Sequence, residues 1–287
     1  MIQEKAYAKL NISLDISGIR ADGYHELVMV MQTIDITDSI SIERNDSNTI
    51  TSESNFTFLP TDEKNLAVKA AKLFLEKIGK NDEGVHITLQ KEIPTGAGMA
   101  GGSADAAAVL RAMNKAHDNV LSEEELLSVA GMVGSDVPYC TLGGTALAKG
   151  RGEILKTLPE FPDCEIVVVK PDFSISTPEL FKAVDSIKLK MHPDTKGIIL
   201  ALENQDLGGI CRRLYNVFED VPDRRMKTVA EIKKELLQAG ALGSIMTGTG
   251  SAVYGVFENG TVPAELEEIL EKKYGLCHVA RPVEKLI

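Results

Sequence analysis

The chain has 287 residues, of which 44% are hydrophobic and 25% charged, values that argue against disorder, collagen or a coiled coil. Its length suits two moderate domains or one large α/β unit. Lys and Arg total 31 and Asp and Glu total 42, so the net charge is −11, and we expect neither nucleic acid nor membrane as a partner.

No apolar run reaches the ~18–20 residues that span a bilayer, and the amino-terminal segment carries charges inside its apolar pattern. No cysteine pair has C-x-x-C spacing or a histidine spaced for zinc; the four are Cys140, Cys164, Cys211 and Cys277. We interpret them as reduced thiols, which predicts a cytoplasmic protein without a structural metal.

The first half of the chain begins with a clear strand pattern. From Ala6 to Ile16 apolar and polar residues alternate, which predicts a strand with one buried face. An Asp-Gly pair within residues 20–25 then marks a turn. Further strands are expected at Val28–Ile36, Ile40–Arg44 and Val85–Lys91, and helices at Leu66–Ile78, from Ser103 to about Lys115, and from Ser122, where Glu125 completes a capping box.

Residues 145–148 and 154–158 indicate a hairpin, and we place a domain boundary near residue 160. In the second half we expect a strand at Glu165–Lys170 and then a short helix with Ser176 and Glu179 as its capping box. The remaining elements are a helix from Asp223 to Gln238, strands at Ser244–Thr247 and Ala252–Phe257, a helix near Ala264–Lys273 and a strand at Cys277–Arg281. This mixture favours an α+β fold with two domains, residues 1–160 and 161–287, over a doubly wound sheet.

A glycine-rich loop between an expected strand and an expected helix is the strongest chemical signal. Glycines let the backbone turn its N–H groups toward a ligand, and a helix N-terminus adds unpaired N–H groups and the positive end of a dipole. The sequence therefore predicts a phosphate cradle; the alternative is a flexible turn capped by Ser103. The loop consists of Pro94, Thr95, Gly96, Ala97, Gly98, Met99, Ala100, Gly101, Gly102 and Ser103.

Two familiar nucleotide motifs match this loop only in part. Gly96, Gly98 and Gly101 have the spacing of the dinucleotide fingerprint, but no acidic residue ends a following strand, which argues against a nicotinamide oxidoreductase. The loop is also close to a Walker motif, with Gly102 where the lysine belongs. A cation for the phosphates must then come from elsewhere in the chain.

Three further places could carry chemistry. Lys9 shares the polar side of the first strand with Asn11, so it is either the missing cation or part of a solvated face. Asp136 follows an expected helix and precedes a strand-like segment, so it is either catalytic or a cap or turn residue. The glycines of residues 247–251 either approach a ligand or form a tight turn.

Three of these segments together resemble the motifs of the GHMP kinase superfamily. They are residues 8–11, residues 94–107 and residues 247–251, in that order and spacing. The segments at 20–25, 134–138 and 177–181 narrow the resemblance to the branch that acts on 4-diphosphocytidyl-2-C-methyl-D-erythritol. The resemblance extends from about residue 6 to residue 257.

The resemblance implies a fold and a reaction. The fold would be an N-terminal kinase domain with a left-handed βαβ crossover and a C-terminal ferredoxin-like α+β domain, with the ligands between them. ATP, with Mg²⁺, would phosphorylate the 2-hydroxyl of the small-molecule substrate, in the non-mevalonate route to isoprenoids. Phosphoryl transfer depends mainly on positioning and charge stabilisation, so a backbone cradle, one lysine and one aspartate are sufficient.

The resemblance also implies roles for single residues. Asp136 would be the base that takes the hydroxyl proton, Lys9 would stabilise Asp136 and the hydroxyl, and Asn11 would help to hold the substrate. The residues expected around the cytidine are Tyr24, His25, Thr177 and Phe181, and those expected around ATP are the glycine loop, Ala104, Asn65 and Leu66.

Two positions depart from the family pattern. Where the family loop often has a Ser-Ser pair, this chain has Ser103 and Ala104, which leaves only Ser103 for phosphate or metal-water contacts. Arg151 lies where other members can carry an apolar residue, and it either touches the substrate diphosphate or is solvated.

Two alternatives to this function remain. Another GHMP kinase would act on homoserine or a mevalonate derivative, but such substrates have no base for Tyr24, His25 and Phe181 to recognise. A non-catalytic nucleotide sensor would not need both Lys9 and Asp136. The sequence predicts neither the ligands of Mg²⁺ nor the oligomeric state.

Overall fold

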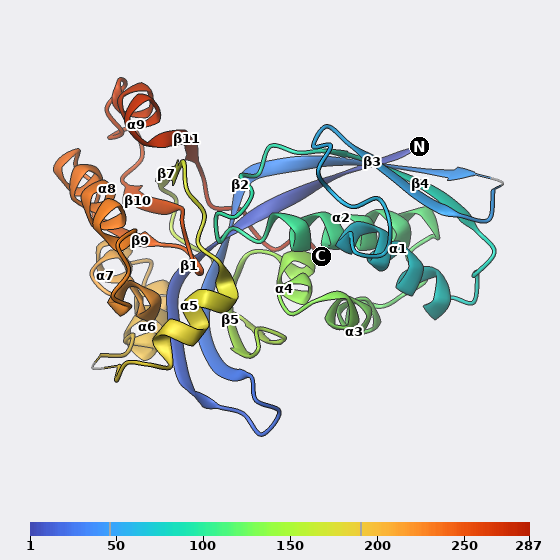
Figure 1. Ribbon diagram of the computed structural model, residues 1–287, viewed down its shortest axis with the longest axis horizontal. Coiled ribbons are helices and arrows are strands. Elements are labelled where there is room, and N and C mark those ends of the chain that lie inside the picture. Colours follow the sequence, from blue (N-terminus) through green and yellow to red (C-terminus); the bar gives the residue numbers. More distant parts are fainter. Residues whose placement is uncertain (46, 190) are drawn as a thin grey trace.

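The computed structural model of the chain describes residues 1–287 except 46 and 190. Two β-sheets organise the described residues, one of seven strands and one of four. In Figure 1 the larger sheet and its helices extend to the right, and the smaller sheet lies on the left with helices on its outer side. This is the α+β arrangement predicted from the sequence. The boundary near residue 160 stays a prediction; it falls between the strands β6 and β7.

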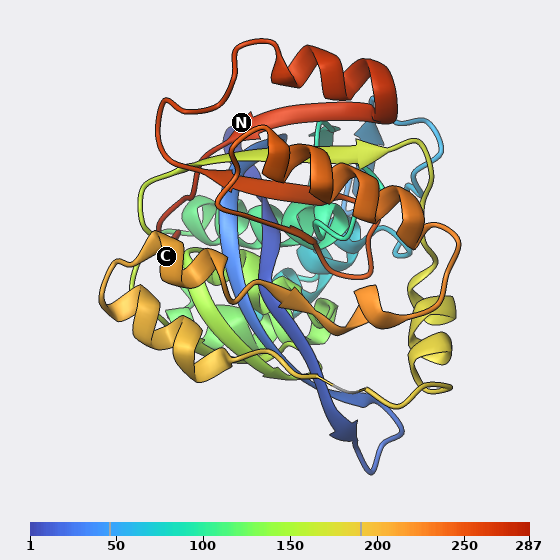
Figure 2. The same ribbon diagram turned by 90° about the vertical axis from the view of Figure 1, so that its left-hand side faces the viewer.

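Two long antiparallel strands form the centre of the larger sheet. β1 (Ile2–Ile19) pairs with β2 (His25–Asn45) along nearly its whole length. Their hairpin extends beyond the rest of the sheet in both views (Figures 1 and 2). The sheet order is β3-β4-β2-β1-β8, with β5 paired to β2 and to β6, and the strands concerned are β3 (Ile50–Ser54), β4 (Gly84–Gln90), β5 (Thr145–Gly150), β6 (Ile154–Thr157) and β8 (Tyr215–Asn216).

β2 is a single strand where the sequence predicted two. The two predicted strands, Val28–Ile36 and Ile40–Arg44, left a gap that includes Asp38, and aspartate is uncommon inside a strand. Asp38 is tolerated there because its carboxylate accepts the backbone N–H groups of Glu92 (2.5 Å) and Ile93 (2.7 Å) and pairs with Lys91. The predicted hairpin of β5 and β6 is confirmed.

Helices cover one face of the larger sheet (Figure 1). In the described chain they are α1 (Leu66–Lys77), α2 (Gly101–Ala116), α3 (Glu123–Val133) and α4 (Val137–Leu142). α2 packs against β1 and is buried from Ala104 to Asn114, and its alanines allow this close approach. The parallel strands β3 and β4 are connected through α1, which supplies the βαβ unit that the family resemblance implies.

The smaller sheet has the order β11-β7-β10-β9, antiparallel throughout. Its strands are β7 (Glu165–Pro171), β9 (Gly243–Met246), β10 (Val253–Phe257) and β11 (Gly275–Ala280). With α8 (Met226–Gln238) before β9 and α9 (Leu266–Tyr274) before β11, this is the expected ferredoxin-like βαββαβ arrangement. Between β7 and α8 the chain also forms α5 (Thr177–Val184), α6 (Thr195–Glu203), α7 (Leu207–Cys211), β8 and the short 3₁₀ helix η1 (Val217–Asp220), of which the sequence predicted only α5.

The helix starts show which capping signals were correct. The predicted capping box of α3 is present, with Ser122 and Glu125 bonded reciprocally. The box expected for α5 is wrong, because the Ser176 side chain makes no capping hydrogen bond and the Glu179 carboxylate lies 3.9 Å from Arg225. α2 begins at Gly101, two residues before the expected start, so Ser103 is not its N-cap.

From Ala8 to Ile16 both faces of β1 are buried, although the sequence predicted only one. The polar side chains of Lys9, Asn11 and Ser13 are at most 5% exposed, like the apolar ones beside them. The outer edge of β1 is covered by later parts of the chain: Asn11 N donates to Thr247 Oγ1 (3.0 Å), and β8 pairs with β1. Burial of this polar face depends on contacts that no local pattern records.

The carboxyl-terminal segment returns to the first half of the chain. Val283 N donates to Thr33 O (2.9 Å) and Leu286 N donates to Leu142 O (2.8 Å). In Figure 1 the C-terminus accordingly lies beside α4. No helix among the described residues is long and apolar enough to cross a membrane.

Candidate active site

A cleft of about 680 Å³ contains most of the residues that the sequence singled out as catalytic or substrate-binding. Its lining comes from the β1–β2 hairpin, the start of α4, the β5–β6 turn, α5 and the loop between β9 and β10. The predicted residues that line it are Lys9, Tyr24, His25, Asp136, Thr177 and Phe181, joined by Arg151. Asn11 does not line the cleft.

A second pocket of about 390 Å³ continues from this cleft along the glycine loop. All ten loop residues, 94–103, line it together with Asn65 and Leu66. The two hollows share Leu66 and part of the loop, including Gly98 and Ser103. Ala104 is 1% exposed and lies outside both linings. The structure therefore brings the predicted nucleotide and substrate residues to adjoining parts of one hollow.

The glycine loop packs against the second glycine loop, residues 247–251. A β-carbon added at Gly98, where φ is +76°, would lie 2.2 Å from the Thr247 carbonyl oxygen. A β-carbon added at Gly248 would in turn lie 2.8 Å from Gly98 O. These two glycines permit close loop-to-loop contact, a reason for glycine that differs from the ligand approach expected from the sequence.

The first turn of α2 faces the smaller pocket. Its N-cap, Ala100, adopts the left-handed conformation and provides no side-chain cap, so the first backbone N–H groups of the helix have no such partner. A β-carbon added at Gly102 would meet only Leu66 Cδ1, at 3.9 Å, so the space in front of this turn is open. Open space before a 16-residue helix N-terminus suits an anionic group such as a phosphate.

Asn65 and Leu66 adjoin this open space at the start of α1. The Asn65 side chain caps α1, accepting from Ala67 N (3.0 Å), and its amide donates to Pro60 O (2.9 Å). Both of its polar atoms are thus engaged by the protein. Leu66 offers an apolar wall that both hollows share.

Lys9 is held in a buried position beside Asp136. Its Nζ donates to Asn11 Oδ1 at 2.6 Å, and the side chain is almost fully buried. Burial lowers the pKa of Lys9, while the charge of Asp136 acts in the opposite direction. Lys9 is therefore not part of a solvated face, and the Asp136 carboxylate favours its protonated form.

Asn11 connects Lys9 to the second glycine loop. Its Oδ1 accepts from Gly248 N (3.0 Å) as well as from Lys9, and its backbone N–H donates to the Thr247 hydroxyl. Among the described residues its Nδ2 has no hydrogen-bond partner. Asn11 is thus placed to position Lys9, and its contact with a substrate stays a prediction.

Asp136 stands at the start of α4, a short helix where the sequence predicted a strand-like segment. Its side chain makes no capping hydrogen bond with this helix. The β5–β6 turn lies against it, since a β-carbon at Gly152 would be 3.3 Å from Asp136 Oδ1. The Asp136 carboxylate therefore does not act as a helix cap. It borders the cleft near Lys9.

Aromatic rings form another part of the cleft lining, which we call its aromatic end. The rings of His25 and Phe181 are 4.8 Å apart between centroids, and Phe181 meets Phe218 edge-on at the same distance. His25 Nε2 is 2.7 Å from Asp185 Oδ1, which fixes the imidazole. Tyr24 is 58% exposed at the rim. These rings offer π-faces to a flat ligand.

The sequence missed several residues of the lining. The Thr249 hydroxyl, 2.8 Å from that of Thr177, joins the second glycine loop to α5. That loop had been noted for its glycines, which were the available signal. Phe218 lies in a 3₁₀ helix of four residues, too short for a periodic pattern. Lys64, beside the smaller pocket, carried no signal at all.

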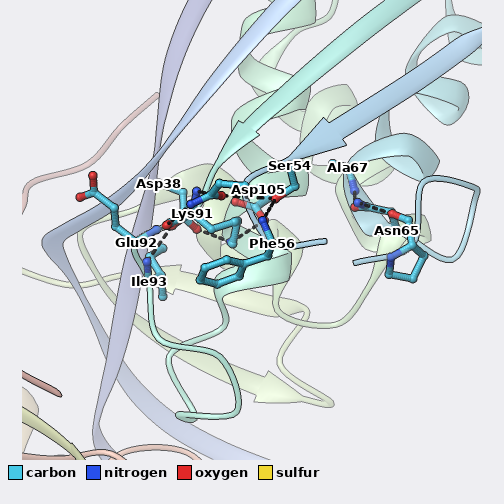
Figure 3. A network of polar contacts seen from close by, with 11 residues as sticks. Asp38, Ser54, Phe56, Asn65, Ala67, Lys91, Glu92, Ile93 and Asp105 are labelled. Carbon is cyan, nitrogen blue, oxygen red and sulfur yellow. Dashed lines mark hydrogen bonds and ion pairs between the residues drawn. The ribbon is translucent and has the colours of Figure 1, made fainter. Parts of the chain in front are cut away.

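A buried ion cluster anchors the glycine loop to the larger sheet (Figure 3). Lys91, at the end of β4, pairs with Asp38 and also with Asp105 Oδ2 (2.6 Å) in α2. Asp38 accepts the two backbone N–H groups that precede Pro94, as described above. Burial raises the pKa of Asp105 to about 7, although the Lys91 charge opposes this shift. The described residues include no group of three or more His, Cys, Asp or Glu side chains suited to a metal ion.

Models of two domain families match the chain. GHMP kinases N terminal domain matches residues 65–144, and GHMP kinases C terminal matches residues 198–276. A 4-diphosphocytidyl-2-C-methyl-D-erythritol kinase of Clostridium botulinum (strain Eklund 17B / Type B) is 44% identical over 97% of this chain and 99% of its own length. The kinase of the same name from Clostridium tetani is 43% identical over the same shares.

Solved structures agree with these matches. A crystal structure of 4-(cytidine 5'-diphospho)-2C-methyl-D-erythritol kinase superposes with a TM-score of 0.81 at 31% identity, covering 98% of this chain and 99% of the other. A homoserine kinase from Cytophaga hutchinsonii gives a TM-score of 0.75 at 19% identity, over 99% of this chain and 96% of its own. The second likeness concerns the fold alone.

Proposed function

The chain belongs to the family of 4-diphosphocytidyl-2-C-methyl-D-erythritol kinases within the GHMP kinases, and we propose that Asp136 and Lys9 carry out the reaction of this family. The enzyme phosphorylates the 2-hydroxyl of 4-diphosphocytidyl-2-C-methyl-D-erythritol with ATP, giving the 2-phosphate and ADP in isoprenoid biosynthesis. The observation that supports these roles is that Lys9, Asp136, the aromatic residues and the glycine loop all border one hollow.

In the proposed mechanism, Asp136 accepts the proton of the 2-hydroxyl as the oxygen attacks phosphorus. Its carboxylate borders the cleft and makes no capping hydrogen bond, so it is available as an acceptor. Lys9, whose charge interacts with that of Asp136, favours the ionised carboxylate and offsets the charge that develops on the hydroxyl oxygen. Asn11 holds the Lys9 ammonium group in place.

The nucleotide would be held by the glycine loop and the first turn of α2. Its phosphates would lie before Gly102, where the pocket is open, with Ser103 as the nearest hydroxyl. When bound, Mg²⁺ would neutralise charge on the β- and γ-phosphates. Because the described residues offer no acidic cluster, we infer that phosphate oxygens and water supply most of its ligands.

The substrate's cytosine would lie between Tyr24 and Phe181, with His25 as the hydrogen-bonding group and Thr177 beside the ribose. Asp185 orients the imidazole of His25. This assignment separates the family reaction from the homoserine and mevalonate types, whose substrates carry no base. We also infer a cytoplasmic location without nucleic-acid or membrane partners, which the four free cysteines and the net charge of −11 support.

The test is an assay of ADP release with three candidate substrates, namely diphosphocytidyl-methylerythritol, mevalonate and homoserine. We expect kcat/KM for the first to exceed the other two by about a hundredfold or more, because the cleft has a base-binding end. Preference for homoserine or mevalonate would overturn the substrate assignment. Nucleotide binding without turnover of any of the three would instead favour the nucleotide sensor.

A further inference from the structure

Arg151 lies at the β5–β6 turn, between the proposed base and the aromatic end of the cleft. The turn is held rigidly, since Gly150 N donates to Glu26 Oε1 (3.1 Å) and Arg151 N donates to Glu153 Oε2 (2.6 Å). The next residue, Gly152, abuts Asp136, as its β-carbon position shows. The backbone of Arg151 is therefore held in place, and its neighbour in the chain, Gly152, lies against Asp136, the proposed base.

The guanidinium of Arg151 points toward Tyr24. Its Cζ lies 5.2 Å from the centre of the Tyr24 ring, which is a cation–π contact. Glu26 supports this arrangement. Its Oε1 accepts from Gly150 N, and its Oε2 accepts from Arg20 (2.8 Å), which lies in the hairpin turn that carries Tyr24. One carboxylate thus ties together the turn of Arg151 and the turn of Tyr24.

No carboxylate within the described part of the chain lies within 4 Å of the Arg151 guanidinium. The acid whose charge it influences, Asp22, is already bonded to Arg20 Nε (3.4 Å) and Tyr24 N (3.1 Å). Arg151 is nonetheless half-buried and lines the cleft. In a chain with a net charge of −11, a half-buried guanidinium without a carboxylate partner indicates an anionic ligand.

The substrate supplies such an anion at the required place. Its diphosphate connects the cytidine to the methylerythritol, so the diphosphate must lie between the base-binding rings and the reacting hydroxyl. The Arg151 side chain contacts the ring of Tyr24, and the β5–β6 turn that carries Arg151 lies against Asp136. Lys9, the other lysine or arginine of this lining, is buried and engaged by Asn11 near the base.

We propose that Arg151 binds the diphosphate of the substrate and thereby selects a cytidine diphosphate group over cytidine alone. The proposal rests on the proposed function, which places the cytosine at Tyr24 and the hydroxyl at Asp136. A planar guanidinium can donate two parallel hydrogen bonds to phosphate oxygens while keeping its stacking contact with an aromatic ring.

The test measures binding of cytidine, CMP and CDP by calorimetry, for the wild type and for Arg151→Gln, Arg151→Lys and Lys149→Gln. Lys149 is an exposed cation of β5 outside the cleft lining, so its variant controls for a change in net charge. We expect Arg151→Gln to weaken CDP binding about tenfold or more, since a charge-assisted hydrogen bond is lost, and to leave cytidine binding unchanged. Arg151→Lys should recover part of the loss and Lys149→Gln should bind like the wild type.

An equal loss for cytidine and CDP would overturn the proposal, because Arg151 would then act only by holding Tyr24. The same conclusion follows if the wild type does not prefer CDP to cytidine, or if Arg151→Gln keeps that preference. Turnover of the wild type in the ADP-release assay is scored separately. An active wild type with an unaltered Arg151→Gln variant rejects this proposal alone, whereas an inactive wild type that binds none of the three ligands rejects the proposed function as well.

Discussion

At the scale of single residues, the main feature is a lysine kept in a buried site beside an aspartate. Burial lowers the pKa of Lys9, and the charge of Asp136 partly restores it. Neither residue can be replaced without changing the electrostatic environment of the other. Their contributions to catalysis should therefore depend on each other.

A double-mutant cycle on kcat measures this dependence. Asp136→Asn keeps the shape of the side chain but cannot take a proton, so kcat should fall by ~10²–10⁴, the usual contribution of a general base, with little change in either KM. Lys9→Met should also lower kcat. The double variant should be little worse than the poorer single variant, whereas fully multiplicative losses would mean that the two residues act independently.

Phe181 tests the base-binding end of the cleft. Its ring contacts both His25 and Phe218, and stacking of a base contributes about 1–3 kcal/mol. Phe181→Ala should raise the KM for the cytidine-containing substrate at least several-fold and leave the KM for ATP nearly unchanged. Ile269→Ala, on an exposed position of α9, is the control and should change neither value. Equal increases in both KM values would contradict the role of Phe181 in binding the cytosine.

Asp105 gives the stability of the protein a specific pH dependence. Its pKa is raised from 3.8 to about 7, so between these values the folded protein holds a proton that the unfolded chain has lost. Stability should therefore fall as pH rises through this window, by up to about 1.4 kcal/mol per pH unit from this group. Asp105→Asn cannot ionise and should lack this component. Denaturant unfolding at pH 4.5, 5.5, 6.5 and 7.5 compares the two slopes; parallel curves would contradict the assignment.

At the scale of elements, the glycine loop and the start of α2 contain two glycines with different tasks. Gly98 has positive φ and no room for a β-carbon beside Thr247, whereas Gly102 is helical and faces open space. The same added methyl group should thus affect folding at one position and nucleotide binding at the other.

Gly98→Ala should destabilise the protein by about 2 kcal/mol or more, from left-handed strain and the clash with Thr247 O. Gly102→Ala should leave the melting temperature unchanged or raise it, because alanine favours a helix over glycine. It should nevertheless weaken ATP binding several-fold, and Gly102→Val more so. Thermal unfolding and calorimetric ATP titration measure both effects. Full ATP affinity in a folded Gly102→Val variant would contradict the cradle.

Elements with long periodic patterns could be predicted from the sequence. Elements that form only by pairing with distant parts of the chain could not. α1, α3 and the strands of the smaller sheet were found close to their observed positions because their apolar periods and caps are local. β8 has only two residues, and its pairing with Ser13 and Leu14 leaves no periodic trace. The polar face of β1 was expected to be half solvated because its cover comes from residues 215–254.

The candidate site followed the same rule. The glycine loop could be picked out by its own unusual composition. Local composition left Lys9 and Asp136 undecided, and their roles were predicted only from the resemblance to the GHMP kinases. The contact of Arg151 with Tyr24 joins residues whose closeness depends on the pairing of β5 with β2. Gly102 could not be distinguished from Gly98 without knowing which neighbour each one faces.

At the scale of the whole molecule, the carboxyl-terminal segment fastens the end of the chain to the first half. Val283 and Leu286 bond to the backbone near Thr33 and Leu142, and Leu286 fills the space beside Gly143. Removal of residues 282–287 should lower the unfolding free energy by about 2–4 kcal/mol, from lost hydrogen bonds and apolar burial. Because these residues do not line the cleft, kcat at 20 °C should be nearly unchanged. A truncated protein with wild-type stability would contradict this account.

The covering of β1 also affects how the protein can be made. A ribosome delivers β1 first and the groups that cover its outer edge much later: Asn216 of β8, Thr247 and Tyr254, whose hydroxyl donates to Asn11 O at 2.9 Å. Until those residues emerge, the nascent chain presents an uncovered strand edge, and the polar face that carries Lys9 and Asn11 is exposed beside it. Such an edge can pair with another nascent chain. Synthesis should therefore be most sensitive to aggregation, and to chaperone supply, between the completion of the first sheet's hairpins and the arrival of β10.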